Sequence, residues 1–386
     1  MERYKSLEAY IDGKKVGTLA TYRDQLIAFE YADSWIKEGY AISPRSLPLQ
    51  KKVYIPKIVP FDGAFGVFAD SLPDGWGHLI VDRMLLREHI NPHEIDILNR
   101  LAIVGETGMG ALTYRPVHKI QSEKAQIEYD RLAAECRHIL GTEYSNDLDT
   151  LFVLSGSSGG ARPKILTKID GEDWIVKFPA SLDDPNIGLV EYQYSLCAKK
   201  CGIEMAETRL LSSRQCEGYF GTKRFDRVAL NGHMKRIHML SVSAILEVSH
   251  RIPSLDYNTL MVLTLELTKD YSEVEKMYRL MCFNVFAHNR DDHSKNFTFL
   301  YDTEKDGWRL APAYDLTYSN SIGGEHATCI NGNGKDPALA DILIVADKIG
   351  ISKSKARRIA EQVQDTVNDE LGKTGILHNM RYTYFQ

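Results

Sequence analysis

Short stretches of alternating apolar and polar residues open the chain and predict β-strands. Residues 7–19, "LEAYIDGKKVGTL", form two such stretches around Asp12-Gly13, a dipeptide typical of two-residue hairpin turns. Residues 25–32, "QLIAFEYA", continue the strand pattern. We therefore expect a β-rich segment at the N-terminus.

Helical periodicity follows this segment. Residues 77–89 predict a helix with apolar side chains on one side, namely Leu79, Ile80, Met84, Leu85 and Leu86. Residues 90–105 predict a second helix, which Asn91-Pro92 opens and Gly105 closes.

The middle of the chain alternates between strands and a helix, after a polar stretch at 116–125 that predicts a domain boundary. Residues 164–180 contain a second Asp-Gly dipeptide between β-branched residues, which predicts another hairpin. A helix is expected over 188–202, ending at Gly202. Further strands are expected over 108–117, 207–211 and 218–228.

The last third of the chain is mostly helical in its pattern, with a β-like insert at 296–315. A small sheet that carries one helix, followed by a helical lobe, has the order of a two-lobed protein kinase. We expect an α+β fold with a β-rich N-terminal subdomain at 1–120, a kinase N-lobe at 121–228 and a helical C-terminal lobe at 229–386. The helices of the last third are expected at about 239–248, 257–268, 270–288, 337–349 and 352–370.

Composition is that of a globular protein without a membrane or nucleic-acid signature. The 386 residues are 44% hydrophobic and 26% charged, and the net charge of -5 gives no general attraction to anionic polymers or membranes. Neither a signal peptide nor an apolar stretch of membrane-spanning length is evident. Six scattered cysteines do not form a disulfide pattern, and Cys197 and Cys201 are expected to be core thiols. These features predict a cytoplasmic protein.

A dense polar segment, "HNRDDHSKNF" at 288–297, follows one of the most apolar stretches of the chain. Asp291 and Asn296 have the spacing of the base and the metal-binding asparagine in the kinase pattern D-x-x-x-x-N. Asp315 follows nineteen residues after Asn296, where a second oxygen ligand for Mg²⁺ is needed. The alternative is a solvated loop in which Asp and Asn only form turns.

A glycine- and serine-rich segment, "SGSSGGARPK" at 155–164, enters the second hairpin directly. Its glycines let the backbone approach a phosphate, although it matches neither Walker A nor the kinase glycine loop. A flexible linker is the alternative. Lys177, in an apolar strand, is expected to contact ATP phosphates, or else to reach solvent from an edge strand. Glu191 is either its partner or a surface residue at a helix start.

Two histidines flank the aspartates of the polar segment. No cysteine or third histidine stands at zinc-ligand spacing from His288 and His293, so we expect them to form hydrogen bonds inside the loop.

The motifs "SSGGARPK", "VKFP", "KRFDR", "NRDDHSKNF" and "APAYDL", in this order, resemble the HipA family of bacterial serine/threonine kinases. "FGVFADSLPDGWG" and "GETGMGALTY" resemble the N-terminal subdomain of that family, so the resemblance covers nearly the whole chain. It implies a toxin of a toxin–antitoxin system that uses ATP and Mg²⁺.

The resemblance also implies roles for individual residues. Asp291 would be the catalytic aspartate and Lys295 would assist it, in a family pattern that Asn289, His293 and Asn296 complete. Asn296 and Asp315 would bind Mg²⁺, and a serine beside the phosphate loop would be autophosphorylated, Ser157 matching best and Ser155 and Ser158 being alternatives. Nucleotide contacts are implied for Gly159, Gly160, Ala161, Arg162, Pro163, Lys164, Lys177, Lys223, Phe225, His293, Asn296, Tyr314 and Asp315. Lys223 departs from the family, which often has an acidic residue at this hinge position.

The family further implies a small helix-turn-helix antitoxin like HipB as partner, DNA contact only through that antitoxin, and targets that include aminoacyl-tRNA synthetases. Two other functions fit parts of the sequence. One is a catalytically silent corepressor that acts with an antitoxin. The other is a small-molecule kinase similar to aminoglycoside phosphotransferases, although the β-rich N-terminal segment has no place in such an enzyme.

Overall fold

The computed structural model describes residues 3–23, 25–118, 127–142, 145, 147–155, 159–230 and 232–372. The chain forms two compact units. Unit 1 comprises 1–188 and 210–248, and unit 2 comprises 189–209 and 249–386. Unit 1 thus contains the first expected domain, the second except for 189–209, and the start of the third, and the three-domain division remains a prediction.

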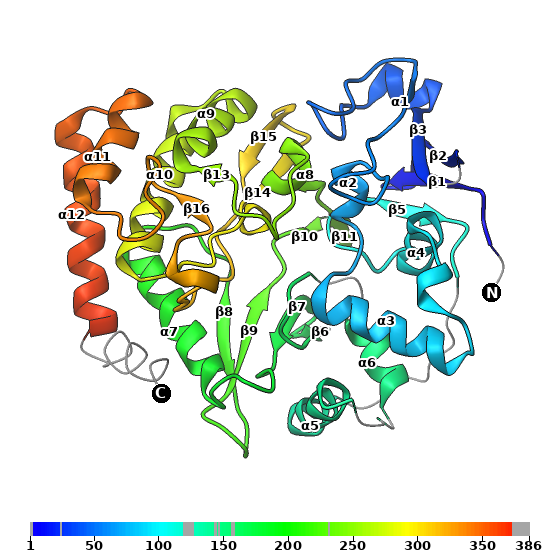
Figure 1. Cartoon of the computed structure of the whole chain (residues 1–386), viewed down its shortest axis with the longest axis horizontal. Helices are drawn as coiled ribbons and strands as arrows, with labels where there is room; N and C mark the ends of the chain where they lie inside the picture. Colours follow the sequence, from blue (N-terminus) through cyan, green and yellow to red (C-terminus); the bar gives the residue numbers. More distant parts are fainter. Residues whose placement is uncertain are drawn as a thin grey trace. The chain divides into compact units, whose positions relative to one another are not determined.

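The N-terminal part of unit 1 is a five-stranded sheet with strand order β4-β3-β2-β1-β5 (Figure 1). Asp12 and Gly13 join β1 to β2 with φ values of 48° and 75°, which are typical of a two-residue hairpin turn, so the first predicted hairpin is confirmed. The strands are β1 (Ser6–Ile11), β2 (Lys14–Tyr22), β3 (Leu26–Tyr31), β4 (Val53–Tyr54) and β5 (Thr113–Arg115).

The helices of this part differ from the prediction in detail. In α3 (Gly75–Arg87), Ile80, Met84 and Leu85 are buried, but Leu86 is 55% exposed, so its assignment to the apolar side is wrong. The single helix expected over 90–105 is a 3₁₀ turn, η1 (Pro92–Glu94), followed by α4 (Ile97–Val104). The side chain of Asp96 accepts a hydrogen bond from Asn99 N at 2.8 Å and starts α4 there, because an N-cap aspartate satisfies a free helical N–H. Unit 1 also contains α1 (Asp33–Glu38) and α2 (Gly66–Ala69).

The second sheet of unit 1 has strand order β6-β7-β9-β8. The second predicted hairpin, between β6 and β7, is confirmed, with Asp170 and Gly171 at φ 54° and 81°. The strands are β6 (Lys164–Ile169), β7 (Glu172–Lys177), β8 (Thr208–Leu211) and β9 (Tyr219–Lys223).

One apolar core joins this sheet to helices from three separate segments. Two of these helices, α5 (Tyr129–Leu140) and α6 (Leu148–Ser155), are not evident in the sequence pattern. The core contains Trp76 and Ile80 of α3, Leu132 and Cys136 of α5, Leu151 of α6, and Ile165, Val176, Phe178 and Tyr219 of the sheet and its flank. The helix α3, which precedes the expected boundary at 116–125, therefore packs in the same core as the sheet that follows it.

A buried ionic cluster stabilises the remaining part of unit 1. The carboxylate of Asp226 is fully buried and accepts hydrogen bonds from Arg224 (2.7 and 2.9 Å), Arg227 (2.7 Å) and Gly110 N (2.7 Å). Burial alone would raise the pKa of Asp226, but the two arginines hold it at about 2. The cluster thus fixes the Gly110 backbone to the start of the hairpin formed by β10 (Arg227–Leu230) and β11 (His233–Arg236), after which come β12 (Met239–Ser241) and α8 (Val242–Leu246).

Unit 2 is mostly helical. Its central helix, α10 (Tyr271–Phe286), packs against α9 and α12 (Figure 1). Asp256 and Asp270 start α9 and α10 by accepting hydrogen bonds from backbone N–H groups two residues ahead. Cys197 and Cys201 are buried and unpaired, as predicted. The other elements are α7 (Ile187–Lys200), α9 (Tyr257–Thr268), α11 (Leu339–Lys348), α12 (Lys353–Val367), the final turn η4 (Asn368–Gly372), and the strands β13 (Leu255–Asp256), β14 (Thr298–Asp302), β15 (Gly307–Leu310) and β16 (Thr328–Cys329).

Over the described ranges of the chain, none of the helices combines the length and the apolar character that crossing a bilayer requires.

A buried histidine in unit 1 makes stability depend on pH. His238 Nε2 lies 2.8 Å from Ile42 O, and burial lowers the pKa of His238 to about 4 despite this hydrogen bond. In the unfolded chain the imidazole of His238 is protonated below about pH 6.5, whereas in the folded protein it stays neutral down to about pH 4. Protonation of the unfolded state should therefore lower the free energy of unfolding by about 3 kcal/mol between pH 7.5 and pH 4.

The variant His238→Gln keeps an N–H donor but does not titrate. Urea unfolding of both proteins at pH 7.5, 6, 5 and 4 should show a smaller loss of stability in the variant below pH 6.5. Parallel stability curves for the two proteins would contradict the assignment.

Candidate active site

The residues predicted to form the site are distributed over both units. The glycine-rich loop, Lys177, Lys223 and Phe225 belong to unit 1, whereas Asp291 and Asn296 with their neighbours and Asp315 belong to unit 2.

The glycine-rich loop of unit 1 is curled by hydrogen bonds to the start of α3. The N–H of Gly160 donates to the Asp74 carboxylate, and Gly160 O accepts from Trp76 N at 3.1 Å. Lys164 Nζ donates to Gly159 O. Gly160 has φ 94°, and a Cβ at this position would lie 2.4 Å from Lys164 Nζ, so only glycine fits this turn without displacing the lysine.

The other end of the serine-rich segment is held by the same part of α3. Trp76 Nε1 donates to Ser155 Oγ at 2.9 Å, and Ser155 Oγ donates to Lys164 O at 3.1 Å. Ser155 is completely buried. Ser157 and Ser158 lie outside the described residues. The segment Asp74-Gly75-Trp76 therefore fixes the backbone on both sides of the predicted phosphoacceptor serines, a role that sequence reasoning missed, although "SLPDGWG" stood out as a family motif.

Arg162, at the end of the loop, is engaged within unit 1. Its guanidinium donates to the Asp183 carboxylate at 2.8 and 3.0 Å. Burial would raise the pKa of Asp183, but Arg162 lowers it below its ordinary value. Ala161 and Pro163 connect these positions, and Pro163 O accepts from Phe178 N at 2.8 Å. The loop is thus tied to the segment that follows β7.

Lys177 ends β7 directly opposite Lys164 on β6 and Phe220 on β9. Its Nζ lies 5.5 Å from the centre of the Phe220 ring. Side chains directly opposite one another in adjacent strands share a face of the sheet, where two like charges destabilise the pairing. Two lysines at this position favour an anion beside them. The glycine-rich loop leads directly into β6, the strand that carries Lys164.

Lys223 and Phe225 lie at and after the end of β9. Lys223 is opposite Trp174 on β7, and its Nζ donates to the Glu172 carboxylate. Phe225 is half-buried. Their predicted contact with adenine stays a prediction.

The segment of unit 2 predicted to be the catalytic loop begins where α10 ends. Asp291 is exposed, and the 3₁₀ turn η2 (Ser294–Asn296) follows it. Asn296 Nδ2 donates to Asp291 O at 2.6 Å, so the side-chain amide has its nitrogen engaged inside the loop. The amide oxygen, which is the ligand that Mg²⁺ prefers, is thereby kept for another partner. The structure brings the predicted base and the predicted metal-binding asparagine together.

The neighbouring aspartate has the opposite environment. Asp292 is buried, and its carboxylate lies 2.9 Å from both Tyr257 Oη and His326 Nδ1 and accepts from Thr328 N at 3.2 Å. Asp292 O also accepts from Thr328 Oγ1 at 2.6 Å. The sequence pattern assigned no separate role to Asp292, because nothing in the residues around two adjacent aspartates indicates which of them is buried.

The network extends from Asp292 to the end of α10. Asn284 Nδ2 donates to Tyr257 Oη at 2.9 Å, and Asn289 Nδ2 donates to Asn284 Oδ1 at 2.9 Å. Buried polar groups that satisfy one another in this way hold a backbone in one conformation. The exposed Asp291 therefore lies between two residues, Asn289 and Asp292, that are fixed from inside unit 2.

The two histidines of the loop differ. His288 Nε2 lies 3.1 Å from Asn320 Oδ1, and its ring stacks on Tyr318 with ring centres 4.8 Å apart. His288 thus forms a side-chain hydrogen bond, but with Asn320 outside the loop and not within the loop as predicted. His293 packs against His250, and its Nδ1 is buried without a hydrogen-bond partner among the described residues, contrary to the prediction.

Tyr314 and Asp315 follow β15. Tyr314 Oη donates to Lys295 O and lies 2.6 Å from Thr298 Oγ1, which joins this segment to the catalytic loop. Asp315 is half-buried and adopts φ 53°, an uncommon value for a residue with a side chain. Among the residues that the structure describes, no group of three or more His, Cys, Asp or Glu side chains is arranged to hold a metal ion. A divalent cation here would need further oxygen ligands, such as those of a nucleotide.

Comparisons with known proteins give consistent results. The model of the HipA N-terminal domain matches residues 7–115, and the model of the HipA-like C-terminal domain matches residues 156–371. The candidate kinase Y4mE of Sinorhizobium fredii is 25% identical over 347 residues, which cover 80% of this chain and 76% of Y4mE. HipA in the Shewanella oneidensis MR-1 complex of HipA, HipB and operator DNA is 18% identical, with a TM-score of 0.71 over 95% of this chain and 90% of that one. The expected mixed α and β kinase-like fold is thus confirmed.

The two adjacent aspartates should respond differently to substitution. Asp292→Ala would leave Tyr257, His326 and the Thr328 N–H without their buried partner and should lower the free energy of unfolding by about 3 to 5 kcal/mol. Asp291→Ala changes an exposed side chain and should alter stability by less than about 0.5 kcal/mol. Denaturant unfolding of the two variants tests this contrast, and equal losses would contradict it.

Proposed function

The chain belongs to the HipA family, and we propose that it is an ATP- and Mg²⁺-dependent serine/threonine protein kinase, the toxin of a toxin–antitoxin system. The single observation that carries this proposal is the geometry of the catalytic loop. Asp291 is exposed while Asp292 after it and Asn289 two residues before it are held by a buried network, and Asn296 is hydrogen-bonded to the Asp291 backbone. A carboxylate fixed in this way suits the orientation of an attacking hydroxyl.

The proposed reaction is transfer of the γ-phosphoryl group of ATP to a serine hydroxyl. Asp291 accepts the proton of the serine hydroxyl while the hydroxyl oxygen forms a bond to the γ-phosphorus. The bond between this phosphorus and the β,γ-bridging oxygen breaks, which releases ADP. Lys295 supplies positive charge beside the transferred group. Mg²⁺, which neutralises charge on the phosphates, would be held by the Asn296 amide oxygen and the Asp315 carboxylate.

The nucleotide would be held by unit 1 through its phosphates. Two facing lysines and a turn in which Gly160 has a positive φ and a Cβ would displace Lys164 Nζ are the features that support this role. Backbone N–H groups of such turns bind phosphate oxygens, and lysine supplies a cation for the same group. Lys223, Phe225, His293 and Tyr314 complete the proposed nucleotide site.

We propose Ser157 as the autophosphorylated residue, with Ser158 as the alternative. Ser155 is disfavoured because its hydroxyl is buried and both donates and accepts a hydrogen bond. A phosphate beside the glycine-rich loop would repel ATP phosphates and so lower nucleotide affinity.

The partners are proposed from the family. A HipB-like helix-turn-helix antitoxin would bind the protein and connect it to DNA, and the phosphorylated target would be a translation component such as an aminoacyl-tRNA synthetase in the cytoplasm. The Shewanella oneidensis HipA structure contains HipB and operator DNA, which supports this choice of partner.

Incubation with Mg-ATP should introduce phosphate at Ser157 or Ser158, detected by mass spectrometry. Asp291→Asn should reduce the rate by at least about a thousandfold, because the attacking hydroxyl loses its base while the exposed position tolerates the change. Omission of Mg²⁺ should have a similar effect.

The matched control is Asp302→Asn, an aspartate at the end of β14 outside the proposed site, which should leave the rate unchanged. Absence of phosphate transfer by the wild type, to itself or to cellular proteins, would favour the silent corepressor. Transfer to small alcohols or aminoglycosides but not to protein would favour the small-molecule kinase.

A further inference from the structure

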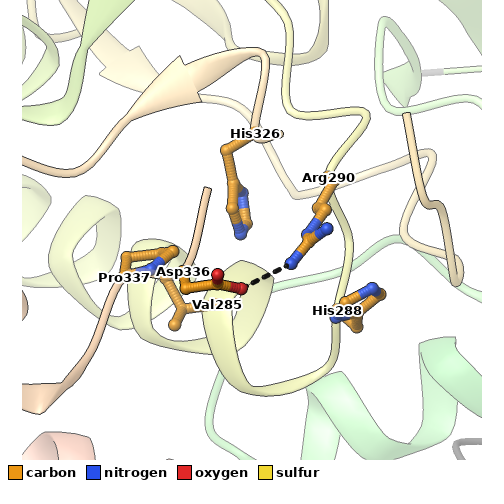
Figure 2. A pocket seen from close by; sticks show the side chains of 6 residues that line it. All are labelled: Val285, His288, Arg290, His326, Asp336 and Pro337. Carbon is orange, nitrogen blue, oxygen red and sulfur yellow. Dashed lines mark hydrogen bonds and ion pairs between the residues drawn. The ribbon is translucent and has the colours of Figure 1, made fainter. Parts of the chain in front are cut away.

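A pocket lies within unit 2, next to the proposed catalytic loop but without any of the proposed catalytic or metal-binding residues. Its volume is about 370 Å³. We call it the basic pocket, and Figure 2 shows the residues that line it, Val285, His288, Arg290, His326, Asp336 and Pro337.

Three basic side chains from two separate segments of unit 2 meet at this pocket. His288 follows α10, Arg290 directly precedes Asp291, and His326 lies shortly before β16. In Figure 2 the Arg290 guanidinium and the His326 ring point toward the space in front of Asp336. His326 Nδ1 is held by Asp292 at 2.9 Å, which fixes the orientation of the ring.

The Arg290 guanidinium is incompletely paired. It donates to Gly324 O and to Lys335 O (2.9 Å), and it lies 3.5 Å from the Asp336 carboxylate, a long contact for an ion pair. The side chain is only 14% exposed, and its Nε is buried and has no hydrogen-bond partner among the described residues. A buried N–H without an acceptor is costly, so this group favours an additional acceptor.

The only acid in the pocket lining is poorly placed to satisfy these groups. Asp336 is 81% exposed, and its distant contact with Arg290 is its one ion pair among the residues that the structure describes. Of the three basic side chains, His326 already contacts the Asp292 carboxylate and His288 contacts Asn320, whereas Arg290 has only the solvated Asp336 as an acidic partner in the described part of the chain. The Arg290 guanidinium thus leaves the pocket suited to an anion with several acceptor oxygens. The guanidinium geometry matches phosphate, and a volume of about 370 Å³ accommodates more than an inorganic ion.

We propose that the basic pocket binds a phosphate monoester. The occupant is either a small phosphorylated molecule or a phosphorylated side chain of this chain, which share the same chemistry. Because Arg290 already contacts Gly324 and Lys335, a bound phosphate would connect the residue before Asp291 to the segment 324–336 and hold both in place. Ordering of a kinase segment by an arginine-bound phosphate is an established physical mechanism.

The test uses full-length protein treated with phosphatase, with O-phosphoserine as the probe and serine as the matched control. Titration calorimetry should show saturable binding of O-phosphoserine only. Arg290→Gln should abolish it. Asp336→Asn removes the competing carboxylate and should tighten binding roughly two- to fivefold.

If Arg290→Gln fails to fold, Asp336→Asn still tests the proposal, because this variant is predicted to bind O-phosphoserine more tightly and misfolding would not produce tighter binding. Lys177→Met should bind the probe as the wild type does, which separates the basic pocket from the proposed nucleotide site. The proposal is overturned if the treated protein does not bind O-phosphoserine, if Asp336→Asn has no effect or weakens binding, or if Lys177→Met alone removes binding.

The source of the phosphate is decided by the same protein before phosphatase treatment. If mass spectrometry finds a phosphorylated residue in unit 2 and the probe binds only after treatment, the occupant is the chain itself. If the untreated protein carries no such residue and binds the probe, the occupant is a free monoester. Neither result depends on kinase activity, so the binding proposal is tested independently of the proposed function.

Discussion

The buried carboxylate of Asp292 is the constraint on which the proposed catalytic loop depends. Burying a charge is favourable only when hydrogen bonds replace its lost water, and these bonds come from two other segments of unit 2, from Tyr257 at the start of α9 and from His326 and Thr328 around β16. Because Asp292 cannot leave this site, the backbone of the exposed Asp291 next to it is fixed as well. The exposed aspartate proposed as the catalytic base thus takes its position from the buried aspartate beside it.

Unit 1 uses the same arrangement with a different element. The glycine-rich loop has few side chains with which to hold itself, and Asp74 and Trp76 at the start of α3 provide the hydrogen bonds that it lacks. Both parts of the proposed active site are therefore segments rich in Gly, Ser, Asp and Asn. Their described residues are held by hydrogen bonds to residues far away in the chain.

Sequence patterns predicted the elements that depend on local interactions. Both Asp-Gly hairpins and the long helices of unit 2 were predicted, because turn chemistry and periodicity are local properties. The spacing of Asp291 and Asn296 also predicted their proximity. Patterns could not separate Asp291 from Asp292, or assign the exposed Leu86 correctly, because burial depends on which distant segment covers a residue. For the same reason α5 and α6, and the contact of Trp76 with Ser155, were not predicted.

The position of α3 has a consequence for how members of this family can be shortened in evolution. Trp76 and Ile80 belong to the same apolar core as Ile165 and Val176 of the sheet that carries Lys177. Loss of the first 115 residues would expose that core to water, in addition to removing a separate sheet. A descendant that lacked this portion would have to cover the exposed core with new apolar residues or with another protein, so the N-terminal region and the nucleotide sheet are expected to be inherited together.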